Sequence, residues 1–453
     1  MSFSTRRSEL KSISEKLLKI AEKFSDFSMV QLYNIKSATT RFGENEITQN
    51  VELNETRASV TLCRDKKTTK VSIDKFDDES IIDKFSKSSV LLDFQKEDTE
   101  FPDFPDKLEV EQPDNCYFDT TANITPDKKA EIISTHIDKC IQKGLLASGI
   151  LTNSEMRFAL SNSKGLFGYF ESTNASFSTT VMDDNGASGW STDNNPDIEK
   201  IDFSKVSSIA IKKSLLNINP KDLEAGKYTV ILEPAAVTDL IRFLSLKGLA
   251  TQLYFDGRSP FSNKLGEKIF SDKITLIDEV DNPLAPGMPF DFEGIKKQNI
   301  YAVENGILKD LPYDLAYAKK NGRKSNGRGL DYPNSYGPFF LSLNLRPGSK
   351  SLEQIISESD KCLLVTHLHY TNLINPNDLT ITGTTRDGLF WIENGKISYP
   401  VKNFRFTQSI IEAFNNVIEI SSDQIVKSAF FGGKSIVAGM KISNFNFTSK
   451  TEY

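Results

Sequence analysis

Few residues in this chain are of the kinds that most often bind metals or form cross-links. Its 453 residues include three histidines, four cysteines and two tryptophans. The cysteines are scattered and no two are spaced as Cys-x-x-Cys: Cys63, Cys116, Cys140 and Cys362. This arrangement indicates neither a disulfide framework nor a zinc ribbon.

The sequence also lacks long apolar runs and blocks of one charge. No run approaches the ~20 apolar residues that a membrane helix needs, and residues 1–16 lack the apolar centre of a signal peptide. We therefore expect a cytoplasmic protein with no membrane partner. The chain has 55 basic and 61 acidic residues, so its net charge is −6. Because phosphate contacts need clustered Lys and Arg, we also expect no nucleic-acid partner.

The clearest pattern in the sequence lies in residues 226–270. Apolar and polar side chains alternate from Gly226 to Leu232, which predicts a strand that ends before Pro234. The next apolar residues are spaced to share one face of a helix: Val237, Leu240, Ile241 and Leu244. A polar loop follows at 255–260. A strand, a helix and a polar loop in this order could form an active site.

This segment resembles the central segment of the TldD/PmbA family, also called TldD/TldE, which comprises metallopeptidases once described as modulators of DNA gyrase. Its end fits the family pattern S-x-F-x-x-x-x-G-E through Ser259, Phe261, Gly266 and Glu267. Two further runs resemble family signatures: RFGENEITQ at 41–49 and TGTTRDGLFWIENGKI at 382–397. The resemblance therefore covers most of the chain.

The second of these runs contains two dipeptides that favour tight turns. Asp387-Gly388 and Asn394-Gly395 are each expected to form a hairpin turn between short antiparallel strands. Arg386, directly before the first of them, is a candidate contact for a bound peptide.

The metal-binding motif of the family is missing from the predicted helix. In the catalytic TldD branch this helix carries His-Glu-x-x-x-His, whereas Arg242, Phe243 and Lys247 stand at the corresponding positions here. Zinc needs imidazole, thiolate or carboxylate ligands, and hydrolysis needs a carboxylate that takes a proton from the bound water. The chain therefore resembles the PmbA (TldE) branch, and we assign no catalytic residue and no cofactor to it.

Two histidines in one predicted strand are the weak candidates for a metal site. Alternation along the strand places His367 and His369 on one face, ~7 Å apart. Zinc would need a third protein ligand, and the sequence does not assign Asp378, Asp387 or Cys362 to that role. The alternative is that one histidine packs and the other forms a hydrogen bond within the sheet.

A glycine-rich basic loop at 321–329 is a candidate anion site. Glycine lets backbone N–H groups approach a ligand, and the side chains of Arg323 and Arg328 could each hold a carboxylate through two hydrogen bonds. The alternative is a solvated loop without a ligand. The region around Arg242 is a further candidate for contacts with peptide carboxylates.

We predict an α+β fold with two domains. Residues 1–218 would form a helix-plus-sheet N-terminal domain, and residues 219–453 a C-terminal domain of mainly antiparallel strands. The resemblance implies a dimer that encloses a chamber, in which TldD hydrolyses unfolded or short peptides and TldE completes the chamber without metal.

Three hypotheses for the function follow. The first is a TldE-like subunit whose heterodimer partner carries His-Glu-x-x-x-His and the zinc. The second is an independent hydrolase with a relocated metal site at His367 and His369. The third is a homodimeric peptide-binding protein without catalysis.

Overall fold

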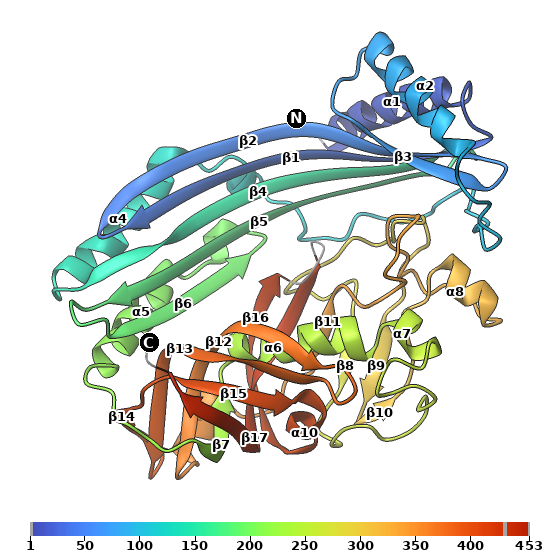
Figure 1. The fold of residues 1–453 in the computed structure, drawn as a ribbon. Coiled ribbons are helices and arrows are strands. Elements are labelled where there is room, and N and C mark those ends of the chain that lie inside the picture. The colour runs from blue at the N-terminus through green and yellow to red at the C-terminus, as the bar shows by residue number, and fades with distance from the viewer. Residues whose placement is uncertain (1–2, 429–432, 452–453) are drawn as a thin grey trace.

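The computed structural model describes residues 3–428 and 433–451. A long, curved antiparallel sheet extends over a C-terminal part that contains two smaller sheets (Figure 1). The curved sheet uses strands from residues 27–195 only, and the smaller sheets use strands from residues 226–450. The predicted α+β class is confirmed, while the domain boundary after residue 218 stays a prediction.

The curved sheet has six strands in the order β3-β2-β1-β4-β5-β6. Its longest strands have 17 and 19 residues, which allows the sheet to span the whole molecule. The strands are β1 (Phe27–Gly43), β2 (Glu46–Arg64), β3 (Lys67–Ile73), β4 (Leu146–Asn162), β5 (Phe167–Met182) and β6 (Ser188–Asn195).

Helices cover one face of this sheet. At one end α1 buries Leu10 and Leu17 against Val30 of β1, and at the other end α4 buries Ile133 beside Phe42. The helices of this part are α1 (Phe3–Ala21), α2 (Asp78–Leu92), α3 (Asp119–Ala122), α4 (Pro126–Ile141), the 3₁₀ turn η1 (Ile198–Lys200) and α5 (Phe203–Leu216).

The start of α4 agrees with its sequence signals. The Thr125 hydroxyl accepts a hydrogen bond from the Lys128 N–H at 3.2 Å, and Pro126 occupies the first helical position. Gly144 follows the helix with a φ of +68°, a conformation in which glycine has no side chain to clash. The residues at both ends of α4 are therefore ones that favour the start and the end of a helix.

The C-terminal part is built around a seven-stranded sheet. Its strands pair antiparallel except for β7 and β12, which run parallel. They are β7 (Gly226–Leu232), β12 (Cys362–Asn375), β13 (Thr380–Glu393), β14 (Lys396–Pro400), β15 (Phe404–Ser409), β16 (Val417–Ser428) and β17 (Lys434–Lys450).

A four-stranded sheet and several short helices complete this part. The strands are β8 (Leu276–Asp278), β9 (Ile300–Glu304), β10 (Ile307–Leu308) and β11 (Leu343–Leu345). The helices are α6 (Pro234–Phe243), the π-helical turn η2 (Leu244–Gly248), α7 (Thr251–Phe255), α8 (Leu315–Lys320), α9 (Leu352–Ser357) and α10 (Ile410–Asn415). The apolar face of α6 is fully buried in the largest core cluster.

One of the two predicted hairpin turns is wrong. Asn394-Gly395 does join β13 to β14, but Asp387-Gly388 lies inside the continuous strand β13. The pairing of β13 with β12 shifts register at this point, so the dipeptide forms a bulge. Asp387 and Gly388 have φ values of +55° and +128°. The same left-handed conformations that favour a turn are used here to bend a strand.

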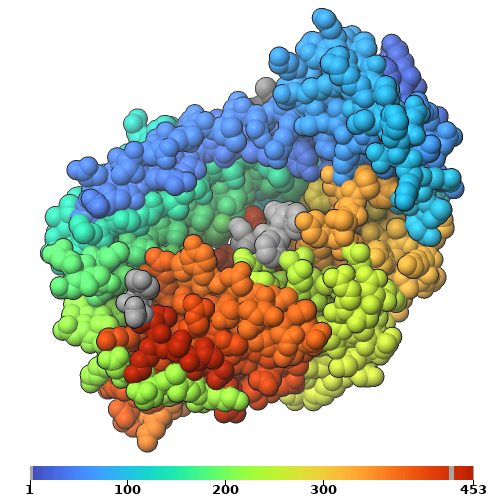
Figure 2. Space-filling model, in the orientation of Figure 1, coloured from blue at the N-terminus to red at the C-terminus, as the bar shows by residue number. Residues whose placement is uncertain are grey.

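The second face of the curved sheet meets the C-terminal part at its two ends. At one end Phe158 of β4 stacks on Phe290, with ring centroids 6.1 Å apart. At the other end Trp190 of β6 contacts His367 of β12. Figure 2 shows a hollow between the sheet and the C-terminal part.

The middle of this face carries small polar side chains that are partly exposed. These residues are Ser37, Thr39, Thr152, Ser154, Ser176 and Ser178. They pair across β1, β4 and β5 on the side opposite the helices. None of the helices in the described part of the chain is long and apolar enough to cross a membrane.

Candidate functional site

The helix that corresponds to the family's metal-binding helix continues into a π-helical turn. The Leu249 N–H donates to the Leu244 carbonyl, five residues earlier, at 2.9 Å. A π-turn is wider than an α-turn and brings residues five apart closer to one side. The spacing from Arg242 to Lys247 is five residues, as between the two histidines of the family motif. Arg242 lies in α6, and Lys247 lies in the π-turn that follows it.

The side chains at these positions do not fit a zinc ion. Arg242 forms an ion pair with Asp239, Nη2 to Oδ1, at 3.4 Å, and Phe243 packs against the core. Guanidinium and ammonium groups are cations, and a benzyl group has no donor atom. Within residues 3–428 and 433–451, no three His, Cys, Asp or Glu side chains are grouped to hold a metal ion. The absence of a cofactor on this chain stays a prediction.

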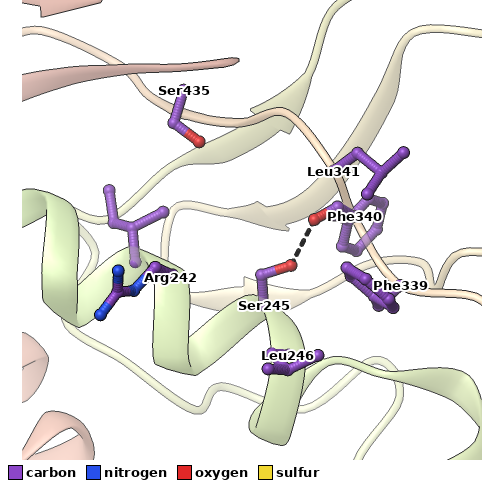
Figure 3. A pocket seen from close by; sticks show the side chains of 8 residues that line it. Arg242, Ser245, Leu246, Phe339, Phe340, Leu341 and Ser435 are labelled. Atoms are coloured by element: carbon purple, nitrogen blue, oxygen red, sulfur yellow. Dashed lines mark hydrogen bonds between the residues drawn. The ribbon is translucent and has the colours of Figure 1, made fainter. Parts of the chain in front are cut away.

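A small pocket lies beside this helix (Figure 3). Its volume is about 10 Å³, which is close to the minimum space for one water molecule. The Ser245 hydroxyl donates to the Phe340 carbonyl at 2.5 Å and ties the π-turn to the segment after residue 338. Arg242 from α6 and Ser435 from β17 both line the pocket. The helix and the β16–β17 hairpin therefore meet here.

His367 joins the two parts of the molecule. Its Nε2 lies 2.8 Å from Asp387 Oδ2, and its ring lies 4.6 Å from that of Trp190 on β6. Burial raises the pKa of Asp387, but the hydrogen bond and charge of His367, together with Ser188 and Arg386, bring this pKa below its usual value. The bulge at Asp387 brings this carboxylate to the histidine.

His369 contacts a cation instead of a carboxylate. Arg386 Nη1 donates to its Nε2 at 2.8 Å, and the Tyr370 ring packs edge-on against it at 4.6 Å. Burial and the nearby arginine both lower the pKa of His369. A metal ion at this ring would face the Arg386 guanidinium and have to displace its hydrogen bond. The candidate metal site thus stays a prediction that this geometry does not favour.

Asp239 links the helix site to the histidine strand. Its Oδ2 accepts a hydrogen bond from the Thr371 hydroxyl of β12 at 2.7 Å, while its Oδ1 pairs with Arg242. Its charge also acts on His369 and on Lys427 of β16. The helix that carries Arg242 and the strand that carries the two histidines are therefore neighbours, although they are far apart in the sequence.

Lys427 and Trp190 complete this cluster. The Lys427 ammonium lies 4.6 Å from the centre of the Trp190 ring, and the indole N–H donates to the Ser178 hydroxyl at 3.0 Å. Burial lowers the pKa of Lys427 to about 8, although the charges of Asp193 and Asp239 act in the opposite direction. Sequence reasoning missed both residues, because no motif surrounds either one.

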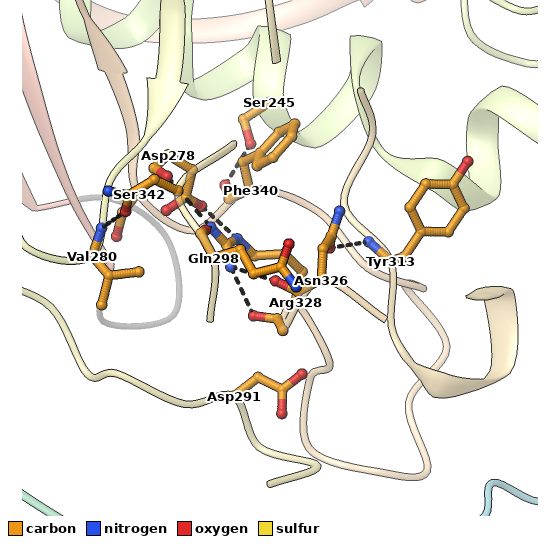
Figure 4. Close-up of polar contacts among 12 residues, drawn as sticks. Ser245, Asp278, Val280, Asp291, Gln298, Tyr313, Asn326, Arg328, Phe340 and Ser342 are labelled. Atoms are coloured by element: carbon orange, nitrogen blue, oxygen red, sulfur yellow. Dashed lines mark hydrogen bonds and ion pairs between the residues drawn. The ribbon is translucent and has the colours of Figure 1, made fainter. Parts of the chain in front are cut away.

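The basic loop gives its two arginines different environments (Figure 4). Arg328 is 3% exposed, and its five N–H groups are used within the chain. They bond to Asp278 Oδ2 and to the carbonyls of four residues: Asn326, Gly327, Asp278 and Gln298. The structure thus gives Arg328 the role of holding this loop together, with no donor left for a peptide.

Arg323 lies at the surface of the same loop. It pairs with Asp310 at 3.1 Å and lies over the Tyr313 ring at 5.3 Å. Its side chain is 44% exposed, and that of Arg386 is 52% exposed. Arg386 belongs to the cluster around His369, but no described contact links Arg323 with that cluster.

A larger cavity lies on another side of the molecule. Its volume is about 960 Å³. It is bounded by the connection at 109–114, by Val280 and Asp281, and by Lys296 and Lys297. Acidic and basic side chains line it together with apolar ones such as Val110 and Pro289.

The similarity to known proteins agrees with this geometry. Residues 225–447 match the family described as the PmbA/TldA metallopeptidase C-terminal domain. Its C-terminal part, residues 225–447, therefore resembles the C-terminal domain of this metallopeptidase family. An uncharacterised protein of Methanocaldococcus jannaschii is 24% identical over 327 residues, which cover 71% of this chain and 76% of that protein. Metalloprotease PmbA of Escherichia coli O157:H7 is 26% identical over 237 residues, 51% of this chain and 49% of PmbA.

Solved structures of family members share the fold over nearly the whole chain. TldE from Thermococcus kodakarensis superposes with a TM-score of 0.86 at 23% identity and covers 96% of this chain and 100% of TldE. A Thermotoga maritima protein described as a modulator of DNA gyrase gives a TM-score of 0.83 at 17% identity, covering 97% and 100%. The alignments to curated TldD and PmbA metalloproteases span about half of those proteins.

Proposed function

We propose that this chain is the metal-free, TldE-like subunit of a TldD/PmbA-type metallopeptidase. The observation that carries the proposal is the presence of Arg242, Phe243 and Lys247 where the family's metal-binding helix has His-Glu-x-x-x-His. The partner subunit would carry His-Glu-x-x-x-His and the zinc. This chain would bind unfolded or short peptides in the hollow and support cleavage by the partner.

The edge of the curved sheet supports an assembly of subunits. The pairing of β2 with β3 covers only residues 58–64 of β2, so residues 46–57 form an edge paired to β1 alone among the described strands. Val51 and Leu53 are 46% and 47% exposed on one face of this edge, and Ile47, which a bulge places on the other face, is 40% exposed. Exposed apolar edge strands readily pair with another chain.

A homodimeric peptide-binding protein is the second candidate, because this edge is self-complementary. Two copies of β2 paired antiparallel about Asn50 would place Val51 of each copy opposite Gln49 of the other. No two acids of the strand would then face each other. A partner with a similar edge would suit the heterodimer equally well.

Native mass spectrometry of the chain, expressed with and without a His-Glu-x-x-x-His paralogue from its own genome, tests the proposal. A one-to-one complex with a single zinc, and peptidase activity only in the complex, is the expected result. A metal-free homodimer that ignores the paralogue would favour the second candidate. Zinc on the chain alone, lost in His369→Gln, would overturn both.

A further inference from the structure

Three acidic side chains of the C-terminal part are buried next to one another. Asp291, Glu293 and Asp314 are 1%, 1% and 5% exposed. The Glu293 N–H donates to Asp291 Oδ1 at 3.0 Å. The Leu315 N–H, one residue after Asp314, donates to Glu293 Oε2 at 2.8 Å. The charges of Asp291 and Asp314 both act on Glu293, so the three carboxyl groups are neighbours.

Two of these acids differ in the donors that surround them. Among the described residues, Asp291 accepts hydrogen bonds from the N–H groups of Glu293, Ile295 and Gly329 at 3.0, 2.8 and 2.7 Å. Glu293 accepts one N–H, that of Leu315, in the same part of the chain. Several backbone donors stabilise a carboxylate, whereas a buried carboxylate with few donors is costly. Asp291 is therefore much better placed than Glu293 to hold a negative charge.

The cations of this region do not neutralise Glu293. The Arg328 guanidinium bonds to Asp278 and to backbone carbonyl groups. The charge of Lys297 acts on Asp291, and burial lowers the pKa of Lys297 to about 8. No ion pair to any of the three acids is found within residues 3–428 and 433–451.

The surroundings of Glu293 thus favour its neutral form. Burial, followed by the charges of Asp291 and Asp314, raises the pKa of Glu293 well above its usual value. Tyr332 is the other titratable group whose pKa responds to Glu293, and burial raises the pKa of that phenol. Burial also raises the pKa of Asp291 to about 6, although its backbone donors act in the opposite direction. At pH 7 the charge therefore lies on Asp291.

The turn that carries Glu293 also contacts the curved sheet. Phe290 and Phe292 lie on either side of Asp291, and both rings contact Phe158 of β4, with centroids 6.1 and 5.6 Å apart. Since Glu293 is almost fully buried, its carboxyl group can reach water only if this turn moves. Such a movement would displace the two rings from Phe158 and loosen the contact at this end of the hollow.

We propose that Glu293 is a pH-sensitive latch, which is protonated while the 290–295 turn is docked on Phe158 and gives its proton to water when the turn opens. This role is separate from peptide cleavage and goes beyond the proposed function. Because opening releases one proton, the ratio of open to docked turn should rise about tenfold per pH unit. The rise ends where Glu293 ionises in the docked state.

Hydrogen–deuterium exchange of the full chain, read by mass spectrometry, tests the latch between pH 6.5 and 7.5. This window lies above the pKa of Asp291 and below that of Lys297. After correction for the intrinsic exchange rate at each pH, the protection of residues 286–296 in the wild-type chain should fall about tenfold. In Glu293→Gln it should stay constant, because the amide still accepts the Leu315 N–H but has no proton to lose.

Two controls separate the latch from general unfolding. Glu353→Gln removes an exposed acid on α9 and should keep the wild-type profile. Peptides from α6, which lies in the largest core cluster, should keep their protection at both pH values.

Three outcomes would overturn the latch. These are wild-type protection that does not change with pH, an equal fall in Glu293→Gln, and a fall that peptides from α6 share. The first and third are measured on the wild-type chain alone, so the test remains decisive if Glu293→Gln does not fold.

Discussion

At the scale of single residues, His136 illustrates a buried group with an electrostatic cost. It is 2% exposed in α4, its Nε2 bonds to the Thr179 hydroxyl at 2.8 Å, and the rings of Phe42 and Phe177 pack edge-on against it. Burial, with a smaller contribution from Lys139, lowers its pKa to about 4. The histidine is therefore neutral in the folded chain at pH 6, where the unfolded chain begins to protonate it.

This difference predicts a pH-dependent loss of stability. The pKa of His136 is lower in the folded chain than in the unfolded chain. Its contribution to the unfolding free energy is therefore fully present above pH 6.5 and is lost as the pH falls toward about 4. The total is about 3 kcal/mol. Between pH 7 and pH 4, the unfolding free energy of the His136→Gln variant, measured in urea, should fall by about 3 kcal/mol less than that of the wild-type chain. His369 is the control, because its ring is more exposed. If His369→Gln altered the pH dependence of the unfolding free energy by the same amount, burial of His136 would not be the cause.

Arg328 and Arg323 form a second residue-scale comparison. Replacing Arg328 by Met leaves the buried Asp278 carboxylate and several carbonyls without their donor. Breaking such a buried pair costs about 3–5 kcal/mol. Arg323→Met removes an exposed pair with Asp310, which costs about 0–1 kcal/mol. Urea unfolding of both variants measures the difference, and similar small losses would show that the Arg328 network contributes little.

Residue identities in the candidate site were only partly readable from the sequence. Arg242, Phe243 and Lys247 were identified because they occupy a motif with fixed spacing. Trp190 and Lys427 were not, because they come from strands of different sheets and meet only after both have folded. The burial of Arg328 could not be predicted for a related reason: a glycine-rich basic loop has the same composition whether its arginine points outward or is buried.

At the scale of elements, strand pairing overrode local turn chemistry in β13. An Asp-Gly pair favours a hairpin turn, and the sequence near Asp387 contains no signal against one. Pairing with β12, which bonds to β13 both before and after the dipeptide, keeps β13 extended instead. Similarly, the apolar spacing of α6 predicted its buried face, but the π-turn depends on Ser245 bonding to a distant carbonyl.

The bulge in β13 gives a prediction for Gly388. A Cβ at this residue would lie 2.7 Å from the Phe390 ring and 2.8 Å from the Thr366 hydroxyl, and its φ is +128°. Gly388→Ala should therefore cost about 1–3 kcal/mol from strain, and more from the clash. It should also move Asp387 away from His367 and change the fluorescence of Trp190, measured in a chain with Trp391→Phe.

Gly186→Ala is the control for that substitution. Its φ is +86°, and nothing lies within 4 Å of the added Cβ. It should lose about 1 kcal/mol for the backbone conformation alone, with the Trp190 signal unchanged. If both variants unfold alike, the packing around the bulge does not matter for the site.

At the scale of the whole molecule, the division into a helix-covered sheet and a mainly antiparallel part follows from patterns within each segment. Alternating strands and amphipathic helices are local signals, so the α+β class could be predicted. The hollow could not be predicted from the sequence. It exists because a sheet with strands of 17 and 19 residues curves over the C-terminal part and touches it at its ends. This curvature depends on the twist of the whole sheet.

The uncovered edge of that sheet carries the last prediction, which concerns assembly. Val51→Lys places a charge beside Leu53 on the uncovered edge of β2, where charged side chains oppose edge pairing. Since Val51 is 46% exposed, the unfolding free energy should change by only about 0.5 kcal/mol. Size-exclusion chromatography and native mass spectrometry should nevertheless show at least about tenfold weaker association. Val90→Lys, at a 56% exposed position on α2, should leave association unchanged, and equal effects of the two substitutions would place the interface elsewhere.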